Sequence, residues 1–280
     1  MTAPTAAVEA EVAHRLGQGD ALSAFDCAAA ARRDGIDSPR LRYQMVRALA
    51  ASGDSLGAMH LYEQFDLATE GDVDSLALAG RIWKDEAFDH GDAERAAFLR
   101  KAAAAYDHAF QASGADFPAI NAASLYAMLG ERERAAALAG PIAANAANAA
   151  ADNYWDRATL VEALLLLGRG EEALFHARAA RGQAGTGAGD RASTCRQIAR
   201  LAASGAISDE DASIIVGILR PPPVGVYCGR MFREGGEGEA NAASAIDAAL
   251  DAQPLSALIG PLACGADILF AEAALARDID

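Results

Sequence analysis

Two glycines near the end of the chain have the setting of a ligand-binding turn. Gly229 and Gly265 each follow a short apolar segment typical of a strand, and open α/β sheets bind ligands beyond the carboxyl ends of their strands. Gly265 also begins a predicted helix whose free N–H groups suit a phosphate. Asp267 in its first turn either accepts a hydrogen bond from a ribose hydroxyl or only favours the helix dipole. Neither glycine has the full GxGxxG or P-loop spacing, so a purely steric role is the alternative.

Metal and nucleophile chemistry find less support. Four cysteines and five histidines are scattered without a CxxC, HxxxH or HExxH spacing, which favours reduced and mostly buried thiols over a metal site. Charged residues cluster on predicted helices at 84–86 and 131–134, a pattern typical of a solvated face. The spacing suggests no Ser-His-Asp or Cys-His arrangement. We therefore predict no catalytic residue, metal or cofactor, and favour a protein that is not an enzyme.

The composition is that of a folded, acidic and helix-rich chain. Its 280 residues are 52% hydrophobic and only 6% aromatic, and much of the apolar content is alanine, which suits closely packed helices. A formal net charge of −15 argues against a nucleic-acid-binding surface, which needs a basic face. The N-terminus lacks the pattern of a signal peptide, and no apolar run reaches about 18 residues. We predict a cytoplasmic protein without a membrane span.

A ladder of glycines divides the first two hundred residues into repeats. Successive members are separated by 34, 38, 39 and 38 residues, and each is followed five residues later by alanine. The glycines are Gly19, Gly53, Gly91, Gly130 and Gly168. Glycine permits the left-handed backbone that ends the first helix of a pair, and alanine lets the second helix approach closely. The period of about 34–40 residues resembles that of tetratricopeptide repeats.

These signals predict a mostly α protein with a change of architecture near its end. Residues 1–219 form a tetratricopeptide-like α-solenoid of five or six helical hairpins, with a last pair at about 190–203 and 208–219 that caps it. Three prolines make 220–223 a stiff linker. Residues 224–280 then form a partial α/β (β-α-β-α) segment, with buried strands at 224–229 and 255–260. A third strand is expected next, so we expect the chain to be part of a longer protein.

Two stretches in the middle of the chain resemble a known family. Residues 106–139 carry Pro118 followed by Ile-Asn-Ala-Ala at 120–123, and residues 153–174 carry Tyr-Trp-Asp at 154–156 with Ala-Thr-Leu at 158–160. Both are similar to bacterial tetratricopeptide proteins related to the TRAF-binding regulatory region of the apoptosis-signal-regulating kinases. The resemblance implies a regulatory platform for protein interaction.

The C-terminal segment resembles the Rossmann-like domain that follows such repeats, and more distantly the nucleotide-sensing SLOG group. Where the family has a Gly-His-Met motif at the end of the first strand, this chain has Gly229-Arg230-Met231, with arginine in place of histidine. The family's Gly-Ala-Asp motif is present as residues 265–267. The resemblance implies a nucleotide site that includes Gly229, Arg230, Gly265 and Asp267.

A tetratricopeptide groove would be lined by first-helix residues 13, 10, 6 and 3 positions before each turn glycine. This rule selects Arg40, Tyr43, Arg47, Arg81, Asp85, Trp155 and Glu162. Arginine and aromatic side chains are common binding hot spots, although packing or solvation would also explain them. Our first hypothesis is a regulatory module that binds a protein or peptide partner in this groove, N-terminal to a signalling or nucleotide-sensing domain. The alternative is a nucleotide-binding or nucleotide-processing protein whose repeats assemble or inhibit the Rossmann-like domain.

Overall fold

A computed structural model describes residues 3–69, 71–146, 153–183, 186–232, 236–253 and 255–279. Within these ranges the first part of the chain forms six consecutive helical pairs. Their helices are α1 (Ala3–Gly17), α2 (Ala21–Arg33), α3 (Pro39–Ser52), α4 (Ser55–Gln64), α5 (Val73–Asp89), α6 (Asp92–Ser113), α7 (Asp116–Met128), α8 (Arg132–Ala146), α9 (Tyr154–Leu166), α10 (Gly170–Arg181), α11 (Ala188–Ala203) and α12 (Asp209–Leu219). A short 3-10 helix, η1 (Leu67–Thr69), joins α4 to α5.

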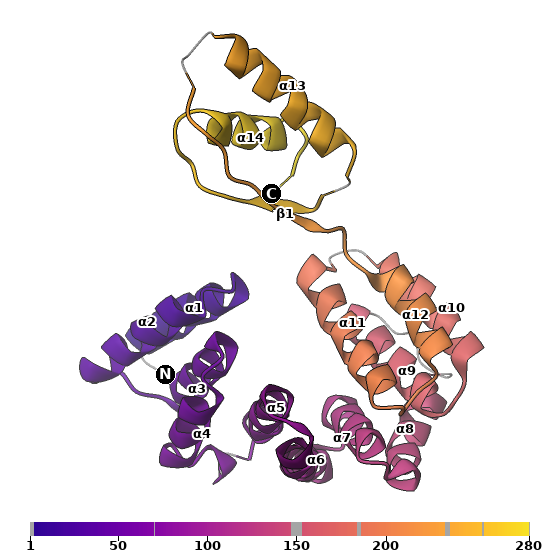
Figure 1. The fold of residues 1–280 in the computed structure, drawn as a ribbon. Helices are drawn as coiled ribbons and strands as arrows, with labels where there is room; N and C mark the ends of the chain where they lie inside the picture. The colour runs from indigo at the N-terminus through magenta and orange to yellow at the C-terminus, as the bar shows by residue number, and fades with distance from the viewer. Residues whose placement is uncertain are drawn as a thin grey trace.

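The pairs stack side by side into a curved, horseshoe-shaped solenoid (Figure 1). Helices α1–α4 form one arm, α5–α8 form the base, and α9–α12 form the other arm. The apolar core is divided along the stack: one cluster joins α1–α5, another α5–α8, and a third α8–α12. Each pair therefore buries its apolar surface against its neighbours, as a solenoid requires, and the predicted tetratricopeptide-like fold is confirmed.

Four of the five ladder glycines end a first helix in the left-handed conformation. Gly19, Gly53, Gly130 and Gly168 have φ angles of 80°, 90°, 81° and 72°. The alanines five residues later, at 24, 58, 135 and 173, are buried. Gly91 is different, because it has φ −72° in an extended conformation directly before α6. The predicted reason for glycine is therefore wrong at Gly91, and the third pair is joined by a different turn.

Two residues show how closely helices within one pair can approach. Gly80 of α5 faces Tyr106 of α6, and a Cβ atom added to Gly80 would lie 2.5 Å from Cδ2 of the tyrosine ring. Tyr106 is only 2% exposed. Small residues such as glycine and alanine therefore bring helix backbones together and fix the wide ring in place.

The C-terminal unit contains β1 (Val224–Val226), α13 (Glu237–Asp251), β2 (Ala257–Ile259) and α14 (Ala266–Leu275). The two strands pair in parallel, with Val224 opposite Ala257 and Val226 opposite Ile259. Its small core contains Ile246, Leu250 and Ala266. The predicted β-α-β-α order is present, whereas the larger Rossmann-like domain stays a prediction.

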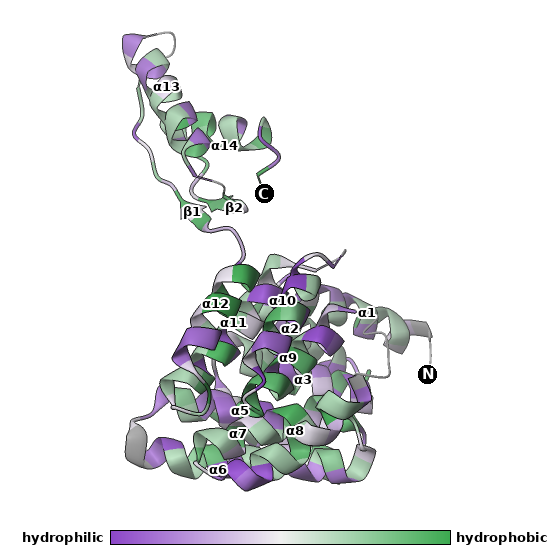
Figure 2. Ribbon diagram, turned by 90° about the vertical axis from the view of Figure 1, so that its right-hand side faces the viewer, coloured by the Kyte–Doolittle hydropathy of each residue, from purple (hydrophilic) through white to green (hydrophobic). Residues whose placement is uncertain are grey.

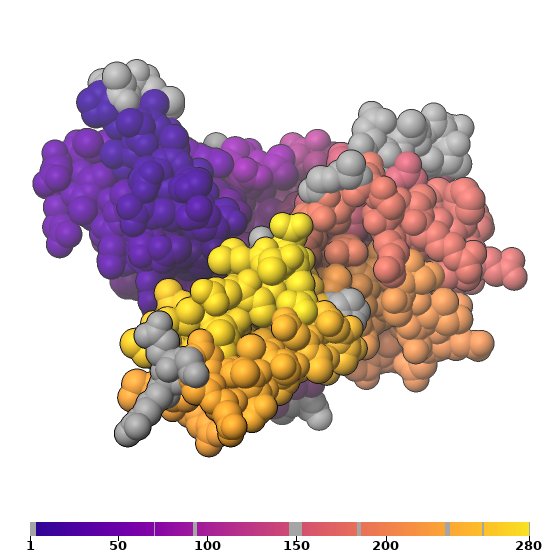
Figure 3. All heavy atoms as spheres, turned by 90° about the horizontal axis from the view of Figure 1, so that it is seen from above, coloured from indigo at the N-terminus to yellow at the C-terminus, as the bar shows by residue number. Residues whose placement is uncertain are grey.

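The prediction that both strands are buried is wrong. The strands are three residues long, and Val224, Val226 and Ile259 are 53%, 83% and 63% exposed, because in the described residues no second layer covers this face of the sheet. Cys228 and Cys264, expected among mostly buried thiols, are exposed as well. The unit stands apart from the repeats, joined to α12 by the proline-rich linker (Figures 1 and 2). Viewed from the open end of the horseshoe, it lies in front of the two arms (Figure 3).

Candidate functional site

A cavity of about 570 Å³ lies on the concave side of the solenoid. Most of its lining comes from the first helices of four successive pairs, α5, α7, α9 and α11, with the turn between α3 and α4 at one end. The position is the one expected for a tetratricopeptide groove, because first helices form the inner layer of the curve.

Four of the predicted groove residues line this cavity. They are Arg81 and Asp85 of α5, and Trp155 and Glu162 of α9. Arg81 and Asp85 are one helical turn apart and form an ion pair of 3.7 Å in which both side chains stay substantially exposed. Trp155 is 50% exposed, so its indole is available to a ligand.

The other three predicted residues, on α3, lie outside the cavity lining. The Arg40 guanidinium lies 5.0 Å from the centre of the Tyr43 ring and forms a 3.5 Å ion pair with Asp74 of α5. Burial and the charge of Asp74 raise the pKa of Tyr43, while the positive charges of Arg47, Arg40 and Arg81 oppose this rise. These α3 residues therefore adjoin the Arg81 side of the groove.

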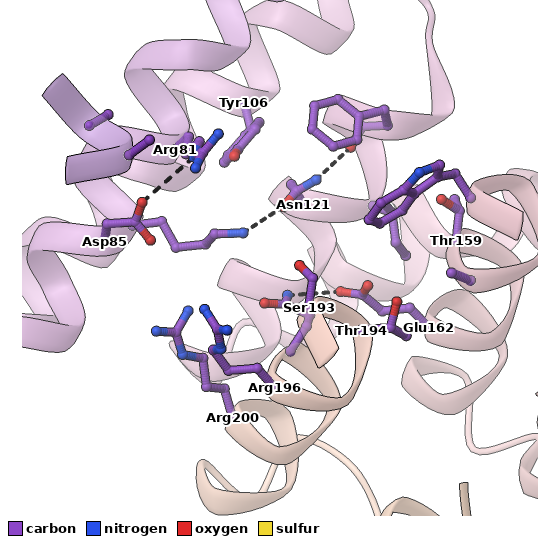
Figure 4. A pocket seen from close by; sticks show the side chains of 18 of the residues that line it. Arg81, Asp85, Tyr106, Asn121, Thr159, Glu162, Ser193, Thr194, Arg196 and Arg200 are labelled. Atoms are coloured by element: carbon purple, nitrogen blue, oxygen red, sulfur yellow. Dashed lines mark hydrogen bonds and ion pairs between the residues drawn. The ribbon is translucent and has the colours of Figure 1, made fainter. Parts of the chain in front are cut away.

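Lys84 of α5 is a further lining residue that sequence reasoning assigned to a solvated face. Its side chain is partly buried, and its ammonium donates a hydrogen bond of 2.9 Å to Oδ1 of Asn121 on α7. Asn121 in turn donates to the carbonyl of Phe117 at 2.9 Å (Figure 4). Burial lowers the pKa of Lys84, and the negative charges of Glu162 and Asp85 oppose this effect. The neighbouring Glu86 is also buried, so the predicted solvated cluster at 84–86 is wrong.

Glu162 lies in a polar network on the groove wall. Its carboxyl group accepts hydrogen bonds from the Ser124 hydroxyl and, at 2.9 Å, from Nε2 of Gln197 on α11. Burial raises the pKa of Glu162, and these two hydrogen bonds and the charge of Lys84 lower it in part. The network connects three inner helices, α7, α9 and α11, through one carboxyl group.

Two arginines of α11 complete the cavity. Arg196 and Arg200 lie side by side and point into the space across from Arg81 and Asp85 (Figure 4). The Arg200 guanidinium stacks 3.7 Å from the centre of the Phe88 ring. Burial lowers the pKa of Arg200, and the positive charge of Arg196 lowers it further, while Asp85 and Asp89 oppose this. Sequence reasoning missed both arginines because α11 was interpreted as a cap, although their spacing of four residues indicated one shared helix face.

The four predicted nucleotide-site residues come together in the C-terminal unit. The loops after β1 and β2 touch, since the Ala266 N–H donates to the Arg230 carbonyl at 3.1 Å. A Cβ atom on Gly229 would lie 2.4 Å from that of Ala266, and one on Gly265 would lie 2.5 Å from the Arg230 carbonyl oxygen. Close packing of the loops therefore explains both glycines. Asp267 is 3% exposed and accepts from the Ala263 N–H at 3.3 Å.

The described residues contain no group of three or more His, Cys, Asp or Glu side chains able to hold a metal ion. None of the described helices is both long and apolar enough to cross a membrane.

Comparison with known proteins supports the repeat fold. The family described as Tetratricopeptide Repeats-Sensor (TPR-S) matches residues 20–126, which is less than half of the chain. TTC0263, described as a thermophilic TPR protein of Thermus thermophilus, has a similar solved structure with a TM-score of 0.55 and 19% sequence identity. The similarity covers 70% of this chain and 99% of that one. No curated protein matches the chain.

The fold and these two similarities define the class of protein: a solenoid of helical pairs with a concave groove. The chain has the fold of a tetratricopeptide-repeat protein. The resemblance to the regulatory region of apoptosis-signal-regulating kinases stays a prediction.

Proposed function

We propose that the chain is a regulatory scaffold that binds a protein partner in its concave groove. The observation that carries this proposal is a pair of exposed aromatic rings at the 570 Å³ cavity, Trp155 at 50% and Phe117 at 56% exposure. Exposed aromatic side chains beside a hollow are the usual anchors of a binding surface. Tetratricopeptide repeats generally mediate binding of protein partners.

The proposed regulation depends on where the groove sits in the chain. Helix α11 contributes one wall, and its Ile198 and Leu201 pack in the same apolar cluster as Ile215 and Leu219 of α12. The linker at 220–223 begins directly after α12. A partner that shifts α11 would therefore act on the helix that carries the C-terminal unit, and we propose that this unit belongs to a signalling or nucleotide-sensing domain.

A second candidate function is nucleotide binding by the C-terminal unit. The observation that favours it is Oδ1 of Asp267, a buried oxygen that faces the position of Gly229 and has no hydrogen-bond partner among the described residues. Under this alternative, a nucleotide such as ATP should raise the melting temperature of the wild type and not that of Asp267→Asn. Substitution of Gly265 is unsuitable as a test, since its φ of 100° would strain any other residue.

Binding to the groove can be tested although the partner is unidentified. Peptides would be selected from a random displayed library on the purified chain, and their affinities measured by fluorescence anisotropy. We expect Trp155→Ala with Phe117→Ala to weaken binding at least about tenfold, because central aromatic anchors supply much of the binding energy. The matched control is Leu22→Ala with Phe175→Ala, two residues that are 67% and 68% exposed on the second helices α2 and α10. Peptides that bind the groove variant and the wild type equally would refute the proposal.

A further inference from the structure

A second cavity, of about 480 Å³, lies on an edge of the solenoid where first helices end and second helices begin, and we call it the edge cavity. Its lining comes from the last turns of α7 and α9, the start of α8, and the turns that join α9 to α10 and α11 to α12. It shares no lining residue with the concave groove. Its volume is within the range of about 300–1,000 Å³ that is typical of small-molecule sites.

The wall of the edge cavity is mostly apolar. Leu166 of α9 and Ala206 of the α11–α12 turn are partly buried, and each packs against both the α5–α8 and the α8–α12 core clusters. The cavity therefore lies where two clusters of the core meet. Gly168 and Gly205 also line it and carry no side chain that could fill it. An apolar ligand would bury the hydrocarbon surface that is left open at this junction, which is favourable.

Arg132, at the start of α8, is the only charged residue among the described residues that line the edge cavity. Its side chain is exposed, and its Nη2 donates a long hydrogen bond of 3.4 Å to the Gly205 carbonyl. In the described part of the chain Arg132 forms no ion pair within 4 Å, whereas Arg134 pairs with Glu131 at 2.9 Å and with Asp107 at 3.5 Å. A ligand with one negative charge would therefore find a cation here that no acidic side chain occupies.

Ser208 offers a second polar contact. Its side-chain oxygen accepts from the Asp211 N–H at 3.3 Å as the cap of α12, which leaves the hydroxyl hydrogen to be donated to a ligand. A carboxylate has two oxygens and can accept from both Arg132 and Ser208, which border the same α11–α12 turn. The described lining contains one cation and no acidic side chain, so neither a metal ion nor a polyphosphate matches it.

We propose that the edge cavity binds a small amphipathic carboxylate, such as a medium-chain fatty acid. The aliphatic chain would lie along Leu166 and Ala206, and the carboxylate would accept hydrogen bonds from Arg132 and Ser208. The edge cavity is separate from the concave groove, so this site does not depend on a protein partner. A bound ligand would join α8 to the α11–α12 turn, and would thereby hold the helical pair that carries the C-terminal unit.

The test is isothermal titration calorimetry of the full chain with hexanoate, octanoate and the neutral analogue octanamide. We expect octanoate to bind at least about fivefold more tightly than hexanoate, because it buries two more CH₂ groups that each contribute up to about fourfold. Arg132→Gln should weaken octanoate at least about threefold and leave octanamide unchanged, since only the carboxylate pairs with the guanidinium. Ala136→Phe should abolish binding of both, because Ala136 is an exposed lining residue of α8 and the larger side chain would fill the cavity.

The matched control for Ala136→Phe is Ala137→Phe. Ala137 is the next residue of α8, is also exposed and lies outside the cavity lining. We therefore expect Ala137→Phe to bind octanoate as the wild type does. Equal helical circular dichroism and melting temperatures of the variants would exclude misfolding as the cause of a loss.

Four results would overturn the proposal. The first is that octanoate does not bind below the concentration at which it forms micelles. The second is that octanoate binds Arg132→Gln as tightly as the wild type, or that both phenylalanine variants weaken it equally. The third is that Trp155→Ala with Phe117→Ala removes octanoate binding, which would place the ligand in the concave groove. The fourth is that an acetylated Leu-Leu peptide binds and octanoate does not, which would assign the edge cavity to the C-terminus of another protein.

Discussion

Gly80→Ala is the substitution that tests the packing of the groove floor most directly. A methyl group at this position of α5 would lie 2.5, 2.7 and 2.8 Å from three carbon atoms of the Tyr106 ring. Carbon atoms in contact are normally about 3.5–4.0 Å apart, so the ring or the helix must move by about 1 Å. The ring is only 2% exposed, so it is packed against protein atoms on most sides.

The expected effect is the difference between two opposing terms. Alanine in a helix interior is favoured over glycine by about 1 kcal/mol, whereas an extra carbon in a filled core costs about 1–3 kcal/mol. The large overlap between the added methyl group and the closely packed Tyr106 ring places Gly80→Ala near the upper end of that cost. We therefore expect a net loss of about 1–2 kcal/mol in the free energy of unfolding, or a fall in melting temperature of about 2–8 °C.

Gly217→Ala is the matched control for this prediction. Gly217 lies inside α12, and outside its own helical turn no heavy atom of the described residues would come within 4 Å of an added Cβ, so only the helix preference remains. We expect a gain of about 0.5–1 kcal/mol. Unfolding in urea, followed by helical circular dichroism, would measure both variants. Gly80→Ala as stable as Gly217→Ala would refute the close α5–α6 contact.

Three further predictions concern a helix cap, a partly buried acid and the linker. Ser38→Ala should lower the free energy of unfolding by about 1–2 kcal/mol in the same urea assay, because Ser38 caps α3 at the Leu41 N–H (3.0 Å) and also donates to Glu9 of α1 at 2.6 Å. Burial raises the pKa of Glu162 above its usual 4.5, so the stabilising contribution of this group is complete below about pH 4.5 and is lost as the pH rises. Between pH 4.5 and neutral pH, the melting temperature of Glu162→Gln should therefore fall less steeply than that of the wild type. Parallel curves of melting temperature against pH would contradict this. A fragment of residues 1–220 should unfold cooperatively, with a melting temperature near that of the full chain, since Leu219 completes the last apolar cluster of the repeats. Non-cooperative unfolding of the fragment would place the domain boundary elsewhere.

The helical pairs could be predicted because their signals are local. Ser38 and Ser208 each cap a helix, since the side-chain oxygen accepts from an N–H three residues later, and serine before a helical pattern is a signal that the sequence itself carries. The turn glycines were predictable for the same reason, as the left-handed conformation depends on one residue. Gly91 failed because a count of residues cannot tell a glycine that ends one helix from a glycine that precedes the next.

The cations of the groove could not be predicted from local pattern. Lys84 and Arg200 belong to helices three pairs apart, and they face one another only because the stack curves. The curvature depends on how each pair packs on the next, through contacts such as the one between Leu166 of α9 and the α7–α8 core. In sequence, Lys84 stands among Asp85 and Glu86 and has the appearance of a solvated charge. Only the folded solenoid separates Lys84, turned to the groove, from Glu86, turned to the core.

The alanine-rich composition and the groove have one physical origin. Alanines at the pair interfaces, such as Ala123 of α7 and Ala163 of α9, fill little volume and allow the inner helices to approach. Close inner helices curve the stack, and the curvature brings α11 opposite α5. Wider side chains at these interfaces would flatten the solenoid and separate Arg196 from Lys84. We therefore expect Ala163→Leu, at a buried position of α9, to weaken binding of the peptides selected on the groove more than the control Leu22→Ala with Phe175→Ala does, although it alters no residue of the cavity lining. Unchanged affinity in a folded variant would show that the curvature does not shape the groove.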